Sequence, residues 1–219
     1  GMLDVPPTCE AKRLKAPLLV DGNVHKQTWE WIKPIPLVDN LGHEPRFKTW
    51  VKAAWFDTHL YLAFWGEDND VWSTYVQHDD PLYRQEVFEF FFSPDEDPGR
   101  YYEIEWNPND AVFDGKIEIH GEERQLDAVW HAEGMRSIAN TERKEDGAPR
   151  AWSCEAAIPF SSIDRLEHPP YVDDRWRVNF FRIDMPNHDY PQELYAWSPT
   201  LIVNFHKPEF FGQMIFKGH

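Results

Sequence analysis

Cysteine is scarce in this 219-residue chain, which contains only Cys9 and Cys154. Two cysteines cannot form the multi-disulfide scaffold of a small secreted domain, although a single bridge between them is left open. Cys154 lies in an apolar run at residues 151–158 and is interpreted as a small buried hydrophobic residue. The sequence therefore predicts a fold that is held together by a hydrophobic core.

Long apolar runs are also missing. No stretch approaches the ~18 apolar residues of a membrane-spanning helix, and residues 1–6 lack the basic and apolar regions of a signal peptide. Gly1 in front of Met2 is typical of a cloning remnant. The sequence predicts a cytoplasmic protein if Met2 is the native start, and a secreted protein otherwise.

Positive charge is in short supply, because 22 Lys and Arg face 38 Asp and Glu, for a net charge of −16. A surface this acidic repels phosphate groups, so nucleic acids and anionic membranes are not expected as partners. Neutral or cationic ligands remain, and uncharged mono- or oligosaccharides belong to the first class.

Familiar catalytic motifs are absent from the sequence. It has no Gly-x-Ser-x-Gly, no His-Glu-x-x-His, no phosphate-binding glycine loop and no Cys-x-x-Cys. No cofactor is expected. Ten histidines are scattered without a close pair at ligand spacing on one strand, which leaves open only a metal site assembled from distant segments.

Carboxylates are the remaining catalytic material. Glu103 and Glu105 are two residues apart in an alternating segment, so they share one face of a strand about 7 Å apart. That distance suits the acid and base of an inverting glycoside hydrolase, whose carboxyl groups lie about 6.5–9.5 Å apart. Any strand with one polar face gives the same spacing, and a solvated outer face is the favoured interpretation.

Two acidic turns offer hard oxygen ligands. One contains Asp68 and Asp70, and the other contains Asp95 and Asp97. Either could hold a structural Ca²⁺ ion, but neither has the EF-hand pattern, so plain acidic turns are favoured.

The distribution of proline and glycine predicts an all-β fold. Eighteen Pro and eleven Gly divide the chain into runs of roughly five to ten residues with two-residue periodicity. Helical periodicity is limited to residues 25–31 and 159–166. Strands are predicted at 46–56, 59–65, 86–93, 101–107, 111–120, 128–131, 135–141, 151–158, 176–183, 193–197 and 213–216. This pattern indicates a two-sheet antiparallel β-sandwich, jelly-roll or immunoglobulin-like, over residues 17–219 after an N-terminal extension at 1–16.

Aromatic residues are plentiful, with 11 Trp, 8 Tyr and 15 Phe. This many tryptophans exceeds the needs of one core, so some rings are expected at the surface, where sugars pack their C–H faces on aromatic rings. The polar, turn-rich segments 78–85 and 197–212 each carry rings and could form the two sides of a slot.

Taken together, the segments resemble carbohydrate-binding modules of family 9, including stand-alone proteins of that type. The resemblance rests on order and spacing: Leu19-Val20-Asp21-Gly22 followed by Trp29, then 51–70, 86–92, 152–163, 176–184, and the closing Trp197-Ser198 through Pro208 to Phe211-Gly212. It implies an antiparallel sandwich that binds the end of a glycan between two aromatic rings. The implied role is non-catalytic binding beside glycoside hydrolases in the breakdown of polysaccharides such as xylan or cellulose.

The resemblance also assigns site residues. The two clamping rings fall at Tyr83 and Phe205, and the glutamate that binds sugar hydroxyls falls at Glu89. Both rings are smaller than the family's tryptophans, and Glu103 stands at or near the position of a family arginine. Asn204 and His206 are candidates to compensate, and Trp197 is a secondary candidate that is expected to serve packing.

Three functions therefore remain: a sugar-binding sandwich, which is favoured, a glycoside hydrolase that uses Glu103 with Glu105, and a sandwich that became a protein-interaction module. The first requires two rings that face each other across an open gap.

Overall fold

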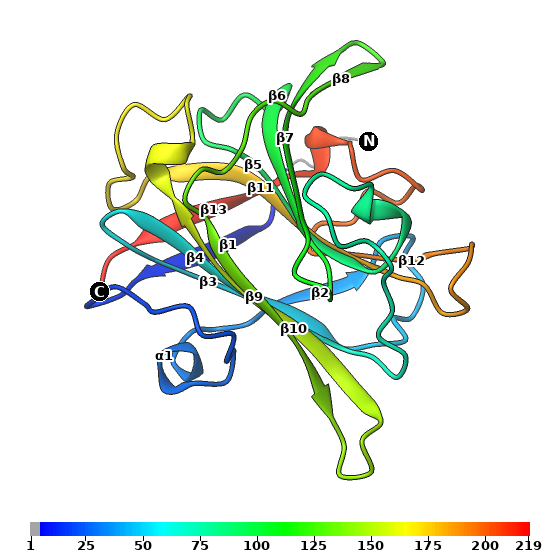
Figure 1. Ribbon diagram of the computed structural model, residues 1–219. Helices are drawn as coiled ribbons and strands as arrows, with labels where there is room; N and C mark the ends of the chain where they lie inside the picture. The colour runs from blue at the N-terminus through cyan, green and yellow to red at the C-terminus, as the bar shows by residue number, and fades with distance from the viewer. Residues whose placement is uncertain (1–4) are drawn as a thin grey trace.

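The computed structural model describes residues 5–219 and shows a sandwich of two β-layers (Figure 1). One layer contains β8 (Glu123–Asp127), β7 (Val112–His120), β6 (Arg100–Trp106), β5 (Val87–Ser93) and β11 (Arg175–Asp184), in that order. The other contains β3 (Thr49–Phe56), β4 (His59–Glu67), β10 (Pro149–Pro159) and β9 (Arg136–Arg143). Two routes of hydrogen-bonded strands connect the layers.

The first route runs from β11 through β12 (Glu193–Ala196) and β2 (Ile35–Asp39) to β3, and all of its pairs are antiparallel. The second runs through β13 (Gly212–Lys217) and β1 (Thr8–Arg13), and β1 pairs in parallel with both β13 and β3. The sheet is therefore antiparallel except along β1. Because hydrogen-bonded strands join both sides of the sandwich, its two layers are held in fixed relation.

Within residues 5–219, helical structure is confined to short turns. These are α1 (Gln27–Glu30), η1 (Leu82–Arg84), η2 (Phe160–Ser162) and η3 (Pro208–Phe210). Of the helices within residues 5–219, none has the length and apolar character to cross a bilayer.

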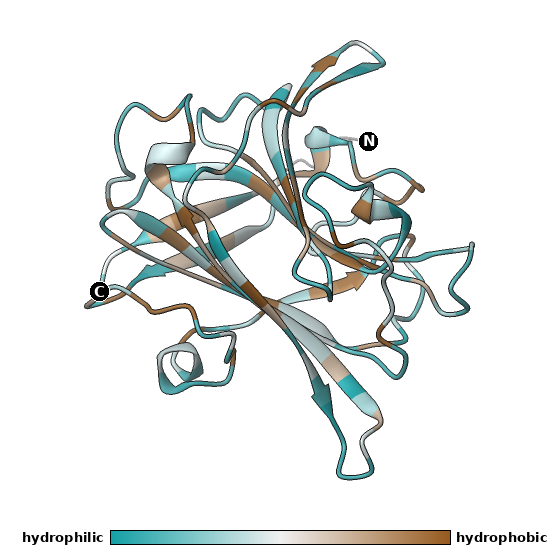
Figure 2. Ribbon diagram, in the orientation of Figure 1, coloured by the Kyte–Doolittle hydropathy of each residue, from teal (hydrophilic) through white to brown (hydrophobic). Residues whose placement is uncertain are grey.

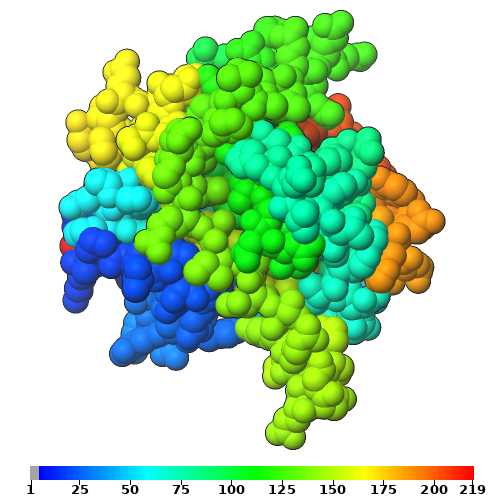
Figure 3. Space-filling view, viewed as in Figure 1, coloured from blue at the N-terminus to red at the C-terminus, as the bar shows by residue number. Residues whose placement is uncertain are grey.

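Alternation along the strands builds the core between the layers. Phe88, Phe90 and Phe92 of β5 face inward, where they meet rings such as Trp152 and Phe180 from β10 and β11. The intervening residues Glu89 and Phe91 therefore lie on the outer face of the same strand. Figure 2 shows the apolar colour concentrated on the strands and the hydrophilic colour on the loops and hairpin tips. The hairpin tips of β7–β8 and β9–β10 project from the body at opposite ends (Figure 3).

Each outer face carries a further buried cluster. On β3, β4 and β10, the cover is provided by the segment from Val20 to Ile32, which contains α1 and the buried Trp29. On β5, β6 and β11, the cluster includes Phe91, Phe181, Phe205 and Phe211. The aromatic residues thus fill three apolar regions instead of one.

The all-β sandwich prediction is confirmed, with differences in detail. The segment 128–131 is not a strand, while β1, β2 and β8 were not predicted. All five residues of β8 are exposed, so its sequence lacks the apolar alternation that marks a half-buried strand. Within β2, Pro36 interrupts the strand signal.

The N-terminal region differs from the extension predicted for residues 1–16. Residues 1–4 lie outside the described residues, whereas β1 pairs with β13 and β3 and contributes Cys9 and Ala11 to the central core. Cys9 and Cys154 are both buried, and neither forms a disulfide. The open alternative of a single bridge is therefore not realised in this structure.

Candidate functional site

A pocket of about 380 Å³ opens on the outer face of the β5–β6–β7 region. Its volume lies within the range of about 300–1,000 Å³ that is common for small-molecule sites. Its lining combines three carboxylates, several apolar side chains and a polar rim. The lining residues are Tyr83, Glu89, Glu103, Glu105, Phe113, Ile117, Arg124, Leu126, Ile183, Gln192, Leu194, Val203, Asn204, Phe205 and His206.

The floor of the pocket is acidic because of strand register. Glu89 of β5 pairs directly with Glu105 of β6, and Glu103 lies two residues away on the same face. Oxygen atoms of the three side chains lie within 4.8 Å of one another. All three residues are buried, at 2%, 5% and 1% exposure for Glu89, Glu103 and Glu105. The expectation of a solvated outer face was therefore wrong, because side chains of β7, β8 and residues 203–206 surround the three glutamates.

Burial and mutual repulsion change the acidity of this floor. Burial, followed by the charge of Glu103, raises the pKa of Glu89 well above its ordinary value. Burial, followed by the charges of Glu89 and Glu103, does the same to the pKa of Glu105. Within residues 5–219, Glu89 Oε2 and Glu105 Oε1 are buried without a hydrogen-bond partner. Protons kept on these carboxyl groups can hydrogen-bond the three glutamates to one another, and the sides that line the pocket are open to the hydroxyl groups of a ligand.

The two predicted clamp rings both line the pocket, but they are not equivalent. Tyr83, in η1, is 47% exposed. Phe205 is only 7% exposed and stacks on Phe181, with ring centroids 4.0 Å apart and an interplanar angle of 18°. The expectation of two open, facing rings is therefore not met, because the Phe205 ring is buried against Phe181 of β11. One ring remains open for stacking.

The loop after β12 supplies polar groups beside Phe205. His206 Nδ1 lies 2.6 Å from the Tyr101 hydroxyl, and its ring stacks on Phe91 at a centroid distance of 4.8 Å. Burial lowers the pKa of His206 to about 4, so its imidazole is neutral near pH 7. Asn204 Oδ1 accepts the backbone N–H of His206 at 2.9 Å, which fixes the loop. Both predicted residues therefore reach the pocket rim.

Trp197 belongs elsewhere, as its expected packing role suggests. It does not line the pocket, and its indole packs against the central core beside Gly212. A Cβ atom at Gly212 would lie 2.3 Å from that ring, so the glycine leaves room for it. The placement argues against Trp197 as a ligand-binding residue.

The four aspartates considered for calcium have Arg or His side chains as neighbours. Asp95 and Asp97 bind Arg100 at 2.9 and 3.2 Å. Asp70 pairs with His188 at 2.7 Å. The buried Asp68 lies 3.3 Å from Arg182, in a cluster that also contains Glu86 and Asp184. These contacts account for the acidic turns, and calcium at either turn stays a prediction.

Several pocket residues were not predicted. Arg124 and Leu126 come from β8, whose polar sequence gave no strand signal, and Gln192 comes from the loop before β12. Phe113 and Ile117 of β7 were assigned to a strand, but alternation alone does not say which face meets a pocket. The alternation of Phe113, Gly115 and Ile117 with Asp114 and Lys116 was the available signal.

A family model described as "Carbohydrate-binding family 9" matches residues 18–216. The chain belongs to this family. The motif residues of the first turn now have a structural role in this family-9 chain: Glu155 of β10 accepts the backbone N–H groups of Asp21 and Gly22 and the indole N–H of Trp29, at 2.8, 3.0 and 2.7 Å. Comparison with curated proteins gives no match.

Solved structures share the fold of this family-9 chain. A Bacteroides uniformis protein described as a candidate carbohydrate-binding protein is 18% identical with a TM-score of 0.75, over 96% of this chain and 99% of that one. A family-9 module from Caldicellulosiruptor kristjanssonii in complex with cellotriose is 15% identical with a TM-score of 0.71, over 97% and 95%. The structure of a family-9 module from the same organism in complex with glucose is 14% identical with a TM-score of 0.69, over 97% of each chain. At these identities the likeness shows the fold.

Proposed function

We propose that this family-9 chain binds the end of a neutral glycan in the pocket over Glu89, Glu103 and Glu105, and does not cleave it. The observation that carries the proposal is the acidic floor, where Glu89 Oε2 and Glu105 Oε1 are buried and unpartnered within residues 5–219. All three glutamates line the pocket, so sugar hydroxyls can donate to the carboxyl oxygens that face it, and a carboxyl group that holds its proton can donate in return.

The walls of the pocket suit the rest of a sugar ring. Tyr83 offers an open aromatic face to the C–H groups, while Phe205 presents a fixed apolar surface beside it. Asn204 and the neutral His206 provide amide and imidazole groups at the rim. With one open ring instead of two, we expect dissociation constants of roughly micromolar to millimolar, equivalent to about 4–8 kcal/mol.

The ligand class is an uncharged glucan or related polymer. The Caldicellulosiruptor kristjanssonii module was solved with cellotriose and with glucose, which supports a β-glucan end as the first candidate. Xylan is the second candidate. A binding module of this kind would act beside glycoside hydrolases, and membership of the family supports that association.

The test is calorimetric titration with glucose, cellotriose and xylotriose. Saturable binding of at least one sugar is expected, together with a loss of about tenfold or more in Tyr83→Ala and Glu89→Ala, because each removes one contact of about 1.4 kcal/mol or more. Trp31→Ala is the matched aromatic control, since Trp31 is 75% exposed and does not line this pocket. Equal affinity in the wild type and both pocket variants would place the sugar elsewhere.

A glycoside hydrolase is the second candidate, because an acid catalyst also requires a buried carboxyl with a raised pKa, and Glu105 has one. Chromogenic glycosides separate the two functions. We expect no turnover; turnover that is abolished by Glu105→Gln would establish catalysis. If no sugar binds and none is cleaved, the protein-interaction alternative replaces both.

A further inference from the structure

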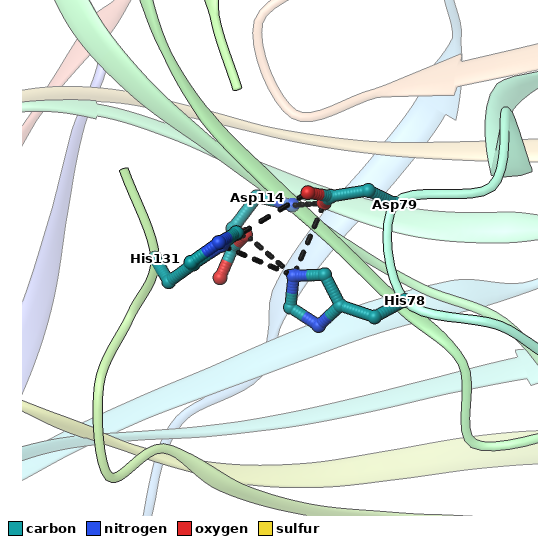
Figure 4. Close-up of side chains that lie close together, drawn as sticks. All are labelled: His78, Asp79, Asp114 and His131. Carbon is teal, nitrogen blue, oxygen red and sulfur yellow. Dashed lines mark hydrogen bonds and ion pairs between the residues drawn. The ribbon is translucent and has the colours of Figure 1, made fainter. Parts of the chain in front are cut away.

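Four side chains that are distant in sequence converge on the opposite face of β7 from the sugar pocket (Figure 4). His78 and Asp79 lie in the loop before η1, Asp114 lies on β7, and His131 lies in the connection from β8 to β9. Phe113 and Ile117 point into the pocket, so Asp114, which alternates with them, points away from it. The loop before η1 and strand β7 lie side by side on the face drawn in Figure 3.

The ligand atoms of these side chains form a compact polyhedron. His78 Nε2 and His131 Nδ1 each lie 2.9 Å from Asp114 Oδ1, and the two nitrogens lie 3.2 Å apart. Asp79 contributes Oδ1 at 3.2 Å from His78 Nε2 and Oδ2 at 3.9 Å from His131 Nδ1. A tetrahedral zinc site with bonds of about 2.0–2.1 Å has ligand-to-ligand edges of about 3.3–3.4 Å. The observed separations bracket that value.

The four side chains can satisfy one another without an ion, because Asp114 Oδ1 has two lone pairs and can accept one N–H from each imidazole. A neutral imidazole carries its single N–H on either ring nitrogen. With the protons on the outer nitrogens, His78 Nε2 and His131 Nδ1 direct two lone pairs at the same point as the two carboxylates, which is the donor set of a cation site.

The carboxylates are held in place by the surrounding backbone. Asp114 has a side chain only 2% exposed, and its Oδ2 accepts the Ala132 N–H at 2.9 Å, which turns Oδ1 toward the histidines. Asp79 Oδ1 accepts the Asp114 N–H at 3.0 Å. Outer hydrogen bonds of this kind orient the ligands of metal sites and raise metal affinity. The cluster therefore has a supporting shell as well as a set of ligands.

We propose that His78, Asp79, Asp114 and His131 form a binding site for a divalent transition-metal ion, with Zn²⁺ as the ion of best fit. Two imidazoles and two carboxylates balance the charge of a divalent cation, and imidazole ligands favour zinc and its neighbours over Ca²⁺ and Mg²⁺. A cleft of about 340 Å³ beside the histidines gives the ion access from solvent.

Bound metal would tie three segments together: the loop before η1, β7 and the β8–β9 connection. Tyr83 lies five residues after His78, so the same ion anchors the loop that carries the open pocket ring. A ligand that binds only the folded state stabilises it by mass action. The site therefore stabilises the fold by joining these three segments, and it is separate from the sugar-binding groups.

The test uses the full chain without a polyhistidine tag, because such a tag binds Zn²⁺ itself. Calorimetric titration with ZnCl₂ is expected to give one ion per chain and a rise in melting temperature. His78→Ala and His131→Ala, both at solvent-accessible positions, are expected to weaken Zn²⁺ binding about 100-fold or more. His120→Ala is the matched control, because His120 pairs with Glu118 at 3.0 Å and lies outside the four-residue cluster, so it should change nothing.

A second measurement replaces zinc by Co²⁺, whose visible absorption becomes intense in a four-coordinate site. Intense bands that are lost in His131→Ala support the proposal. Wild-type affinity in both histidine variants, the same loss in His120→Ala, or displacement of Zn²⁺ by an equal concentration of Ca²⁺ would overturn it. Sugar titrations are read out separately, so failure of the metal site leaves the glycan proposal intact.

Discussion

Both outer faces of the sandwich bury glutamate side chains, but only one face provides hydrogen-bond partners for all of their carboxyl oxygens. On β10, Glu155 is fully buried and accepts the N–H groups of Asp21, Gly22 and Trp29, while the Lys26 ammonium lies 2.7 Å from Oε2. On β5 and β6, Glu89 and Glu105 are just as buried, but each has an oxygen without a partner within residues 5–219.

The difference separates a structural carboxylate from a candidate binding one. At Glu155 the charge is neutralised and every oxygen is used, so the residue anchors the N-terminal segment over the sheet. At the pocket floor, burial and neighbouring acidic groups raise the pKa of Glu89 and Glu105, and each has an oxygen without a partner within residues 5–219, which costs folding free energy. Burial alone does not identify function, whereas burial with unused hydrogen-bonding capacity points to it.

The largest effect is expected from Glu155→Ala. The substitution removes the common acceptor of two backbone N–H groups and an indole N–H, and it leaves Lys26 without its buried partner. Urea denaturation should show a loss of about 3–5 kcal/mol in the free energy of unfolding. Glu118→Ala, an exposed control, should stay within about 0.5 kcal/mol. A loss below about 1 kcal/mol for Glu155→Ala would contradict the comparison.

Gly22→Ala, in the segment that covers β3, β4 and β10, should cause the next largest loss in the free energy of unfolding. Gly22 has φ of +83°, and an added Cβ would lie 2.7 Å from side-chain atoms of Asn140 and Ile138. Gly147 has φ of +87° but open space around it, so Gly147→Ala isolates the backbone strain. We expect about 2 kcal/mol or more for Gly22→Ala and about 1 kcal/mol for Gly147→Ala in thermal or urea unfolding. Equal losses would mean that close packing on this face is unimportant.

Glu105→Gln should stabilise the protein by about 1 kcal/mol near neutral pH. Because the pKa of Glu105 is raised above its ordinary 4.5, the folded state keeps the proton to higher pH than the unfolded state. Wild-type stability therefore falls as pH rises above about 4.5, and the variant lacks this part of the fall. Urea unfolding between about pH 4 and pH 8 should show two curves that converge at low pH. A variant less stable than the wild type at neutral pH would show that the Glu105 carboxyl group stabilises the fold, as Glu155 is expected to do.

The smallest stability effect is expected at the open ring. Tyr83→Ala should change the free energy of unfolding by less than about 0.5 kcal/mol, because nearly half of the residue is exposed. Phe205→Ala should cost about 3 kcal/mol or more, because its ring is buried against Phe181. Denaturation of both variants checks the contrast. A large loss in Tyr83→Ala would show that this ring is part of the core.

Much of the fold follows from local pattern. The hairpin of β3 and β4, the all-buried β5 that ends at Ser93, and the alternation in β6 are each visible in the sequence. The β8 strand is not, because its five residues are exposed and its assignment depends on pairing with β7. Likewise β1 is recruited by β13, which lies at the other end of the chain.

The candidate site was predicted in part. Tyr83, Glu89, Glu103, Glu105, Asn204, Phe205 and His206 all line one pocket, and their roles in binding stay a prediction. Sequence pattern placed the glutamates on one strand face, but it could not say that loops cover that face. The four residues of the proposed metal site were out of reach, because their convergence depends on three separate segments.

Most of the strands, the two-residue alternation and the acidic, aromatic composition follow from side chains that are close along the chain, whereas β1, β2 and β8 do not. Only the packing of distant segments placed the cover over β3, β4 and β10, left carboxyl oxygens of Glu89 and Glu105 without a partner within residues 5–219, and brought His78 and His131 together. Those outcomes depend on how distant strands and loops pack together, and packing places groups in contact that have no relation in sequence.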